Sequence, residues 1–194
     1  MDVIFASSRG STVADKLIKA HLSPENFRIY FESSAKLEDL QHMAYDFLEH
    51  NPDPTNCHIY FVAGLCDITH RIVDYYKAGR YEEVIYIDSP QDTIHRMTRL
   101  IDSISQEILI LGAKPCFSTI IPCSLRAWNI DTRLKQGKTT HTLHSHQYED
   151  MQYMLNRVVI EINQHITQTN ISNNMATPLL ASTILTRRQG APPP

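Results

Sequence analysis

The chain has 194 residues, a formal net charge of −3 and a sequence pI near 6.3, with 42% hydrophobic and 20% charged residues. This length supports one domain with a sizeable core, and the composition is typical of globular proteins. The acidic balance argues against a dedicated nucleic-acid-binding protein, which needs a concentrated basic stripe to contact phosphates. No apolar run approaches the roughly 18–20 residues that span a bilayer, so we expect no membrane partner.

The N-terminus and the cysteines indicate a compartment. The chain starts directly with the strand pattern Met-Asp-Val-Ile-Phe and lacks the basic region of a signal peptide. Its four cysteines lie in or beside apolar runs and form no CxxC pair, a pattern typical of reduced core thiols. We therefore expect an intracellular protein, in the cytoplasm or the nucleus.

Apolar runs separated by breakers predict strands that alternate with helices. The expected strands are residues 2–6, 27–31, 57–63 and 115–122, with a further strand or extended piece over the sheet edge at 83–87. The expected helices are 12–22, 34–48, 68–77, 90–111 and 147–169, and Ser34 is the expected N-cap of the second. Residues 124–137 have the least regular pattern. The alternation predicts a three-layer α/β/α sandwich with a mainly parallel sheet.

Residues 57–63 form the expected central strand, because they are apolar without the polar alternation of a half-exposed strand. The run leads into Gly64, Cys66 and Asp67. Open α/β sheets bind ligands at such a turn, beyond the carboxyl end of a central strand. From local structure alone, Asp67 is expected to cap the helix that begins at residue 68. Cys66 is expected to be a small buried side chain, with a reactive thiol at a helix N-terminus as the alternative.

Several polar segments are expected at the same edge of the sheet. Ser7-Ser8 follows the first strand, residues 64–67 follow the central strand, and residues 122–124 follow the late strand. Residues 139–146, which contain three histidines, precede the last helix and can return to this edge. A hydroxyl, backbone N–H groups and imidazoles in one crevice are the components of acyl-transfer sites.

The order of these segments over about residues 1–169 resembles the SGNH (GDSL-type) hydrolase family. That family has its nucleophilic serine in a Gly-Asp-Ser turn after the first strand, a Gly-x-Asn-Asp block after a central strand, and an Asp-x-x-His block before the C-terminal helix. The resemblance implies that Ser8 is the nucleophile and His144 the base. It also implies that the Gly64 region, together with the Ser8 backbone N–H, stabilises the oxyanion.

The sequence departs from the family pattern in each block. Ala6-Ser7 stands where the family has Gly-Asp. Cys66 replaces the oxyanion asparagine, and a thiol is a weak hydrogen-bond donor. The loss of one good oxyanion donor typically costs about 10²–10³ in rate. His141 stands where the family has the aspartate of Asp-x-x-His, so no carboxylate at that position fixes the tautomer of His144.

The same residues also allow other interpretations, which do not depend on the family resemblance. The Ser8 hydroxyl can bond within its own Ser-Ser-Arg-Gly-Ser turn. His144 and His146 lie on the same side of an extended segment, which permits a metal or an HUH-type nuclease site. Ser145, however, stands where HUH pairs have an apolar residue, and no cysteine–histidine spacing matches a zinc motif. We therefore predict no metal and no cofactor.

Two functions remain open, and with them whether the chain is an enzyme. The first is an esterase of small acyl or acetyl esters, in which Ser8 attacks, His144 is the base, and Gly64, Cys66 and Asp67 form the oxyanion side or rim. The second is a catalytically inactive SGNH-like domain that binds a protein partner or assembles within a larger protein. Degenerate domains of this kind occur in viruses and mobile genetic elements, and residues 137–152 suggest that setting.

The sequence predicts one SGNH-like domain over residues 1–169. Residues 170–194 are polar and end in Ala-Pro-Pro-Pro, so they are expected to form a flexible tail or a linker. The sequence assigns no oligomeric state.

Overall fold

The computed structural model describes residues 1–7, 27–51, 53–74, 81–85, 89–135 and 145–178. The expected helix over 12–22, the candidate residues Ser8 and His144, and residues 179–194 of the expected tail lie outside the described residues.

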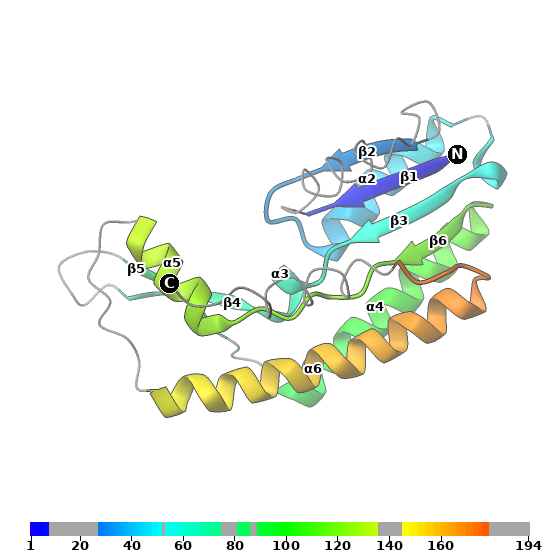
Figure 1. Ribbon diagram of the computed structural model, residues 1–194. Helices are drawn as coiled ribbons and strands as arrows, with labels where there is room; N and C mark the ends of the chain where they lie inside the picture. The colour runs from blue at the N-terminus through cyan, green and yellow to red at the C-terminus, as the bar shows by residue number, and fades with distance from the viewer. Residues whose placement is uncertain (8–26, 52, 75–80, 86–88, 136–144, 179–194) are drawn as a thin grey trace, which may run out of the picture.

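The core of the molecule is a four-stranded parallel sheet in the order β2-β1-β3-β6 (Figure 1). Its strands are β1 (Asp2–Ala6), β2 (Phe27–Phe31), β3 (His58–Val62) and β6 (Lys114–Phe117). β1 pairs in parallel with β2 and β3, and β3 pairs in parallel with β6. The predicted α/β fold with a parallel sheet is therefore confirmed, and all four strands end at one edge of the sheet, here called the carboxyl edge.

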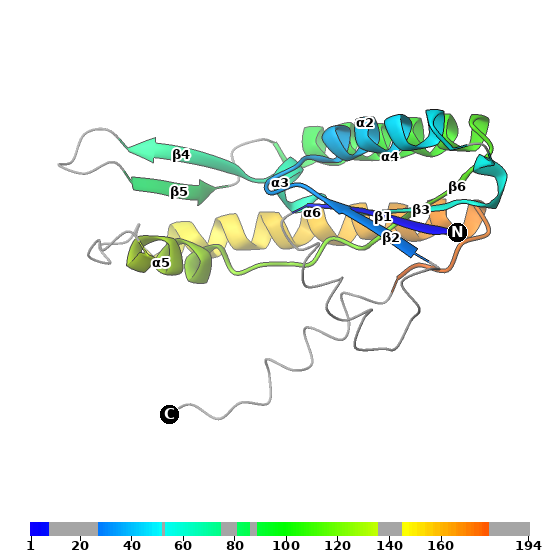
Figure 2. The ribbon, with the colours of Figure 1, turned by 90° about the horizontal axis from the view of Figure 1, so that it is seen from above.

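Long helices cover one face of this sheet and its β6 edge. α2 (Leu37–Glu49) and α4 (Pro90–Ile110) pack on the face, and α6 (Ser145–Ser172) runs along the β6 edge (Figures 1 and 2). The chain between α2 and β3 forms a short 3₁₀ turn, η1 (Pro54–Asn56). Figure 2 shows α2 and α4 side by side along the sheet, and α4 also packs against α6 and β6. Alternate strand residues such as Val3 and Phe5 join the buried sides of these helices in one core.

The other face of the sheet is also apolar. Ile4 and Ala6 are buried there, with Ile29, Tyr60 and Val62 packed against them. This alternation of side chains along β1 shows that both faces of the central strands are covered.

The prediction of a helix over residues 68–77 is wrong. A single turn, α3 (Leu65–Ile68), is followed by β4 (His70–Asp74), which pairs antiparallel with β5 (Tyr81–Ile85). The strand expected near residue 83 exists, but it belongs to this separate two-stranded sheet. Strand preference depends on a pairing partner, which the local spacing of apolar residues does not reveal.

Residues 124–137, expected to be irregular, contain the helix α5 (Leu125–Lys135). The Ser124 hydroxyl accepts a hydrogen bond from the Ala127 backbone N–H at 3.2 Å, which caps the first turn. Asn129 occupies a buried position and donates to the Tyr148 hydroxyl at 3.3 Å. Because this buried residue is polar, the apolar spacing typical of an amphipathic helix is interrupted.

α5 packs on β5, and β4, β5 and α5 together form a lobe beyond the carboxyl edge (Figures 1 and 2).

Two helix ends differ from the predicted ones. The N-cap of α2 is Lys36 rather than Ser34, and the Lys36 backbone N–H donates to the Asp39 carboxylate at 2.7 Å. Ser34 instead has a positive φ of 64° in the turn before the helix. α6 extends to Ser172, beyond the expected end at residue 169, because its last turns are anchored by buried side chains described next.

The outer edge of β6 is bonded by side-chain amides of α6. The Asn170 Oδ1 atom accepts from the Phe117 backbone N–H at 2.9 Å, and its Nδ2 donates to the Phe117 carbonyl at 2.8 Å. Asn173 Nδ2 donates to the Pro115 carbonyl at 3.3 Å. These are the backbone groups that a further strand would use, so the amides stand in for that strand.

The same pattern continues past the end of β6. The Asn163 side chain bonds both backbone groups of Ile120: its Oδ1 accepts from the N–H at 2.7 Å, and its Nδ2 donates to the carbonyl at 3.0 Å. Gln152 accepts from the Leu125 N–H at 2.9 Å and donates to the Cys123 carbonyl at 2.9 Å. We call these four residues, Gln152, Asn163, Asn170 and Asn173, the carboxamide ladder. The ladder fixes the path of the chain after β6 along the length of α6.

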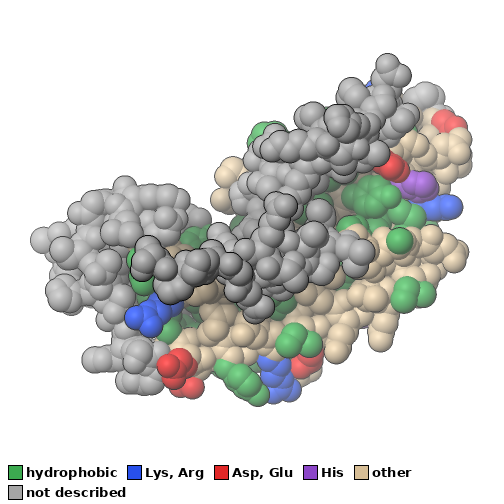
Figure 3. All heavy atoms as spheres, in the orientation of Figure 1, with side chains coloured by type: hydrophobic (Ala, Val, Ile, Leu, Met, Phe, Trp, Pro, Cys, Tyr) green, Lys and Arg blue, Asp and Glu red, His purple; other side chains and the backbone are tan. Residues whose placement is uncertain are grey.

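Among the helices that the structure describes, none combines the length and the apolar character needed to cross a bilayer. On the face shown in Figure 3, the described Lys and Arg side chains lie apart from one another and do not gather in one patch.

Candidate functional site at the carboxyl edge

Backbone hydrogen bonds bring the ends of β1, β3 and β6 side by side. The Ser7 N–H donates to the Val62 carbonyl at 3.0 Å, and the Ser118 N–H donates to the Phe61 carbonyl at 2.9 Å. The turn that begins at Gly64 therefore lies between the end of β1 and the segment after β6. This is the meeting of polar segments predicted from the sequence, as far as the described residues reach.

Gly64 is required at the start of this turn. It is the N-cap of α3 and has a φ of 114°, a conformation that residues with a side chain rarely adopt. A Cβ atom built on Gly64 would lie 2.7 Å from both Cδ1 and Cγ1 of Ile120. The turn after β3 is thus packed directly against the segment that Asn163 holds.

Asp67 connects this turn to α2. Its side chain is 4% exposed, and its two carboxylate oxygens lie 3.1 and 3.3 Å from the Leu37 backbone nitrogen, which donates to them. Leu37 is the first residue of α2, so Asp67 caps that helix from a distant part of the chain. The expectation that Asp67 caps a helix beginning at residue 68 is wrong, because α3 begins at Leu65 with Gly64 as its N-cap.

The electrostatic setting of Asp67 combines opposing effects. Burial raises the pKa of its carboxyl, while the Leu37 N–H and the charges of Arg96 and Lys36 lower the pKa by smaller amounts. Arg96 also donates from Nη2 to the Asp67 backbone carbonyl at 2.7 Å. Asp67 therefore joins α2, α3 and α4 at the base of the candidate site.

Cys66 lies within α3, two residues after Gly64, at the place where the family pattern has its oxyanion asparagine. The side chain is half-buried rather than fully buried, and none of the four cysteines forms a disulfide. The thiol of Cys66 is a weak hydrogen-bond donor compared with the amide of asparagine.

The two residues implied as nucleophile and base are not among the described residues. Ser8 follows Ser7, whose backbone is fixed beside Val62, and His144 precedes Ser145, where α6 begins. Their assignment to catalysis stays a prediction. Among the described residues, no group of His, Cys, Asp and Glu side chains has the arrangement of a metal site.

Some residues that shape this edge were missed from the sequence. Arg96 holds Asp67 from α4, and Asn163 holds Ile120 against Gly64. The sequence does contain one signal, since Asn163 and Asn170 lie seven residues apart among the apolar positions of the last helix. Polar side chains at this spacing on the inner side of a helix need buried partners.

Comparison with known proteins shows which fold this is. No family model and no curated protein sequence matches the chain. Among solved structures, a member of the lipolytic protein G-D-S-L family from Veillonella parvula DSM 2008 is similar with a TM-score of 0.59 at 13% sequence identity, over 98% of this chain and 83% of that chain. A GDSL-like lipase from Bacteroides thetaiotaomicron VPI-5482 has a TM-score of 0.50 at 10% identity, over 91% of this chain and 66% of that chain.

These similarities establish a fold of the SGNH-hydrolase type, as the sequence resemblance implied. At such low identity they carry the fold alone, because one fold supports many functions. They lend no support to an origin in a virus or a mobile element.

Proposed function

We propose that this protein is a serine hydrolase of the SGNH type that acts on small acyl or acetyl esters. The observation that carries the proposal is the arrangement at the carboxyl edge, where Ser7 is bonded beside Val62 and Gly64 opens a tight turn next to it. Ser7 directly follows β1 at the edge of the sheet where open α/β sheets bind ligands, and this supports Ser8, the next residue in the sequence, as the candidate nucleophile.

In the proposed reaction the Ser8 hydroxyl oxygen attacks the ester carbonyl while His144 takes the hydroxyl proton. The backbone N–H of Ser8 and the turn at Gly64 stabilise the negative charge on the carbonyl oxygen. The leaving alcohol takes the proton from His144. A water molecule, activated by the same imidazole, then releases the acid from Ser8.

The test is hydrolysis of p-nitrophenyl acetate by the full chain and its variants. Ser8→Ala and His144→Ala are each expected to abolish turnover, while Ser7→Ala, one residue away, retains it. Loss of turnover in Ser7→Ala with retention in Ser8→Ala would contradict the assignment.

A second function is favoured by two departures from the family pattern. Cys66 supplies a weak donor where the family has asparagine, and His141 stands where the family has aspartate, as in a catalytically inactive domain that binds a protein partner or assembles within a larger protein. The double variant Cys66→Asn, His141→Asp separates the two functions. If the chain is a hydrolase with a weakened site, the variant should gain about 10²-fold or more in rate. A folded double variant without turnover would favour the inactive domain.

A further inference from the structure

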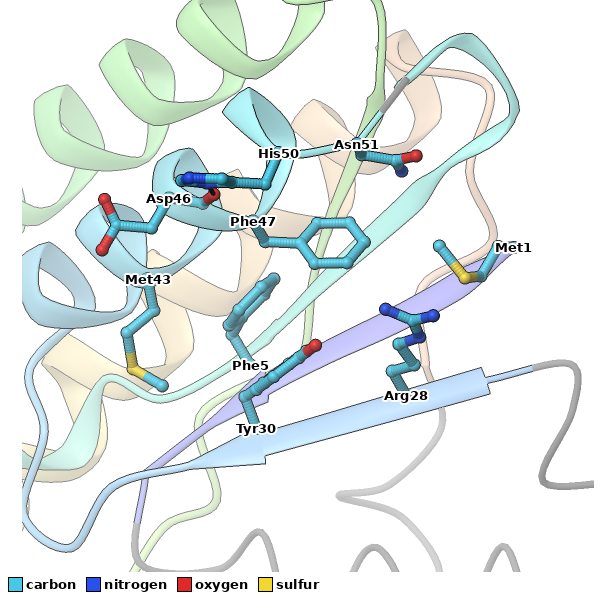
Figure 4. Close-up of a pocket in the computed structure, with 9 residues that line it drawn as sticks. All are labelled: Met1, Phe5, Arg28, Tyr30, Met43, Asp46, Phe47, His50 and Asn51. Carbon is cyan, nitrogen blue, oxygen red and sulfur yellow. Dashed lines mark hydrogen bonds between the residues drawn. The ribbon is translucent and has the colours of Figure 1, made fainter. Parts of the chain in front are cut away.

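A hollow separate from the carboxyl edge lies between α2 and the strands β1 and β2 (Figure 4). Its volume is about 540 Å³, within the range of about 300–1,000 Å³ that small-molecule sites occupy. None of Ser7, Gly64, Cys66 and Asp67 lines it. The hollow is therefore not part of the proposed hydrolase site.

Three aromatic rings form the wall of the hollow. Phe5 stacks on Tyr30 with ring centroids 5.3 Å apart and an interplanar angle of 12°, and Phe47 meets both rings at centroid distances of 6.2 and 6.0 Å. Phe5 is buried, while Tyr30 and Phe47 are half-buried and turn part of their surface to the hollow. Met43 lies beside these rings and adds a polarisable thioether. Such a wall favours a flat apolar group.

Arg28 places a positive charge over one end of this wall. Its guanidinium carbon lies 6.0 Å from the centroid of the Phe47 ring, and the side chain is exposed. Within the part of the chain that the structure describes, the Arg28 guanidinium has no carboxylate partner. A planar guanidinium oriented by an aromatic ring presents its N–H groups as a fork, which matches the oxygens of an acidic group.

The carboxylate that lines the hollow, that of Asp46, does not lie beside Arg28 (Figure 4). Asp46 lies on α2 and His50 is the C-cap of this helix, and Figure 4 shows Asp46 and Arg28 on opposite sides of the aromatic rings. The His50 Nδ1 atom is 2.6 Å from the Asp46 backbone carbonyl, so this ring is tied to its own helix. The end of the hollow at Arg28 is therefore complementary to an anion, and the rest is complementary to an apolar body.

We propose that this hollow binds a small aromatic anion, in which a ring system lies against Phe5, Tyr30 and Phe47 and a carboxylate or sulfonate pairs with Arg28. The site combines aromatic stacking with a charge-assisted hydrogen bond at one end. It does not depend on the proposed hydrolysis at the carboxyl edge.

The first experiment is a fluorescence titration of the full chain with 1-anilinonaphthalene-8-sulfonate, with N-phenyl-1-naphthylamine as the matched neutral probe. We expect one saturable site for the sulfonate, with displacement by 1-naphthoate. Arg28→Met should weaken sulfonate binding by about tenfold or more and leave the neutral probe within about twofold, because only the charged hydrogen bond is removed.

Two further variants make the test specific. Arg28→Lys keeps the charge and loses the planar fork, so sulfonate affinity should fall between that of the wild type and that of Arg28→Met. Arg157→Met removes another exposed arginine, which is paired with Glu161 on α6, and should leave binding unchanged. Sulfonate binding that is unchanged in Arg28→Met, or that falls equally in Arg157→Met, would overturn the proposal. Several equivalent binding sites per chain would overturn it as well.

Discussion

The two outer strands of the parallel sheet, β2 and β6, differ in how the backbone groups on their outer sides are bonded. An edge strand carries a row of N–H and C=O groups without a strand partner. At β6 the carboxamide ladder of α6 bonds those groups, and the chain beyond the strand is held down to Leu125. At β2 the only strand partner among the described residues is β1, and an aromatic hollow lies beside this edge.

This difference indicates that the β6 edge contributes to stability and the β2 edge to binding. Amide pairs with fixed backbone partners leave little freedom, so the β6 edge positions Ile120 against the Gly64 turn. The β2 edge has an exposed Arg28 and half-buried rings that contribute less to the core. We therefore expect substitutions at the β6 edge to affect the free energy of unfolding, and substitutions at the β2 edge to affect binding.

The largest effect is expected from Asn170→Ala. This fully buried amide bonds both the N–H and the carbonyl of Phe117, and each buried group left without a partner costs about 1–3 kcal/mol. The free energy of unfolding, measured by urea denaturation, should fall by about 3 kcal/mol. Asn156→Ala is the matched control, because Asn156 is exposed and Gln152 is its one side-chain bonding partner among the described residues. Equal losses in the two variants would mean that the ladder does not hold the β6 edge.

Gly64→Ala tests the contact between the ladder and the candidate site. The strained φ of 114° and the overlap of the new Cβ with Ile120 should lower the free energy of unfolding by about 2 kcal/mol. Gly112→Ala is the control, since it has a φ of 89° but a nearest contact of 3.4 Å to Thr55 Cγ2, and should cost about 1 kcal/mol. Adding Ile120→Val should recover part of the loss in Gly64→Ala and none in Gly112→Ala. No recovery would rule out the overlap as the cause.

Asp67→Asn should change how stability depends on pH. Because burial raises the folded-state pKa of this carboxyl above its usual 3.8, the folded protein binds more protons than the unfolded chain in the interval between the two pKa values. The contribution of Asp67 to stability is therefore present at low pH and is lost as the pH rises through the folded-state pKa. Asp67→Asn lacks this loss, so its stability relative to the wild type should increase with pH above about 3.8 and then level off.

Urea denaturation of both proteins across this pH range measures the effect. Asp67→Ala serves as the comparison, because it removes the acceptor for the Leu37 N–H and should be less stable than Asp67→Asn at every pH. If the difference in free energy of unfolding between the wild type and Asp67→Asn does not change with pH, burial does not raise the pKa of the Asp67 carboxyl.

The smallest effect on stability is expected from Arg28→Met at the β2 edge. The side chain is exposed and its one described contact is the ring of Phe47, so the free energy of unfolding should change by less than about 0.5 kcal/mol. The melting temperature of the variant, measured without ligand, checks this. A loss as large as that of Asn170→Ala would mean that the two edges do not differ in their roles.

The fold was largely predictable because its main elements carry strong local signals. The strands β1, β2 and β3 are short apolar runs, and α2, α4 and α6 have apolar residues at helical spacing. The β4–β5 hairpin was missed because it depends on the pairing of two segments rather than on either one alone. α5 was missed because Asn129 is buried through a bond to Tyr148, which lies on another helix.

The candidate site was predictable in place but not in detail. Gly64 was found from its position after a buried strand, and its conformation explains why glycine stands there. The partner of Asp67 is Leu37, 30 residues earlier in the chain, and no spacing rule connects the two. The carboxamides of α6 likewise bond backbone groups, which have no signature in the sequence.

The most direct test of the proposed function is covalent labelling with diisopropyl fluorophosphate, followed by intact mass measurement and peptide mapping. If Ser8 at the carboxyl edge is an activated nucleophile, the folded chain will gain a single phosphoryl adduct on Ser8. The adduct should be absent in Ser8→Ala and retained in Ser7→Ala. A folded chain that gains no adduct, or gains it on another residue, would contradict the assignment of Ser8 as the nucleophile.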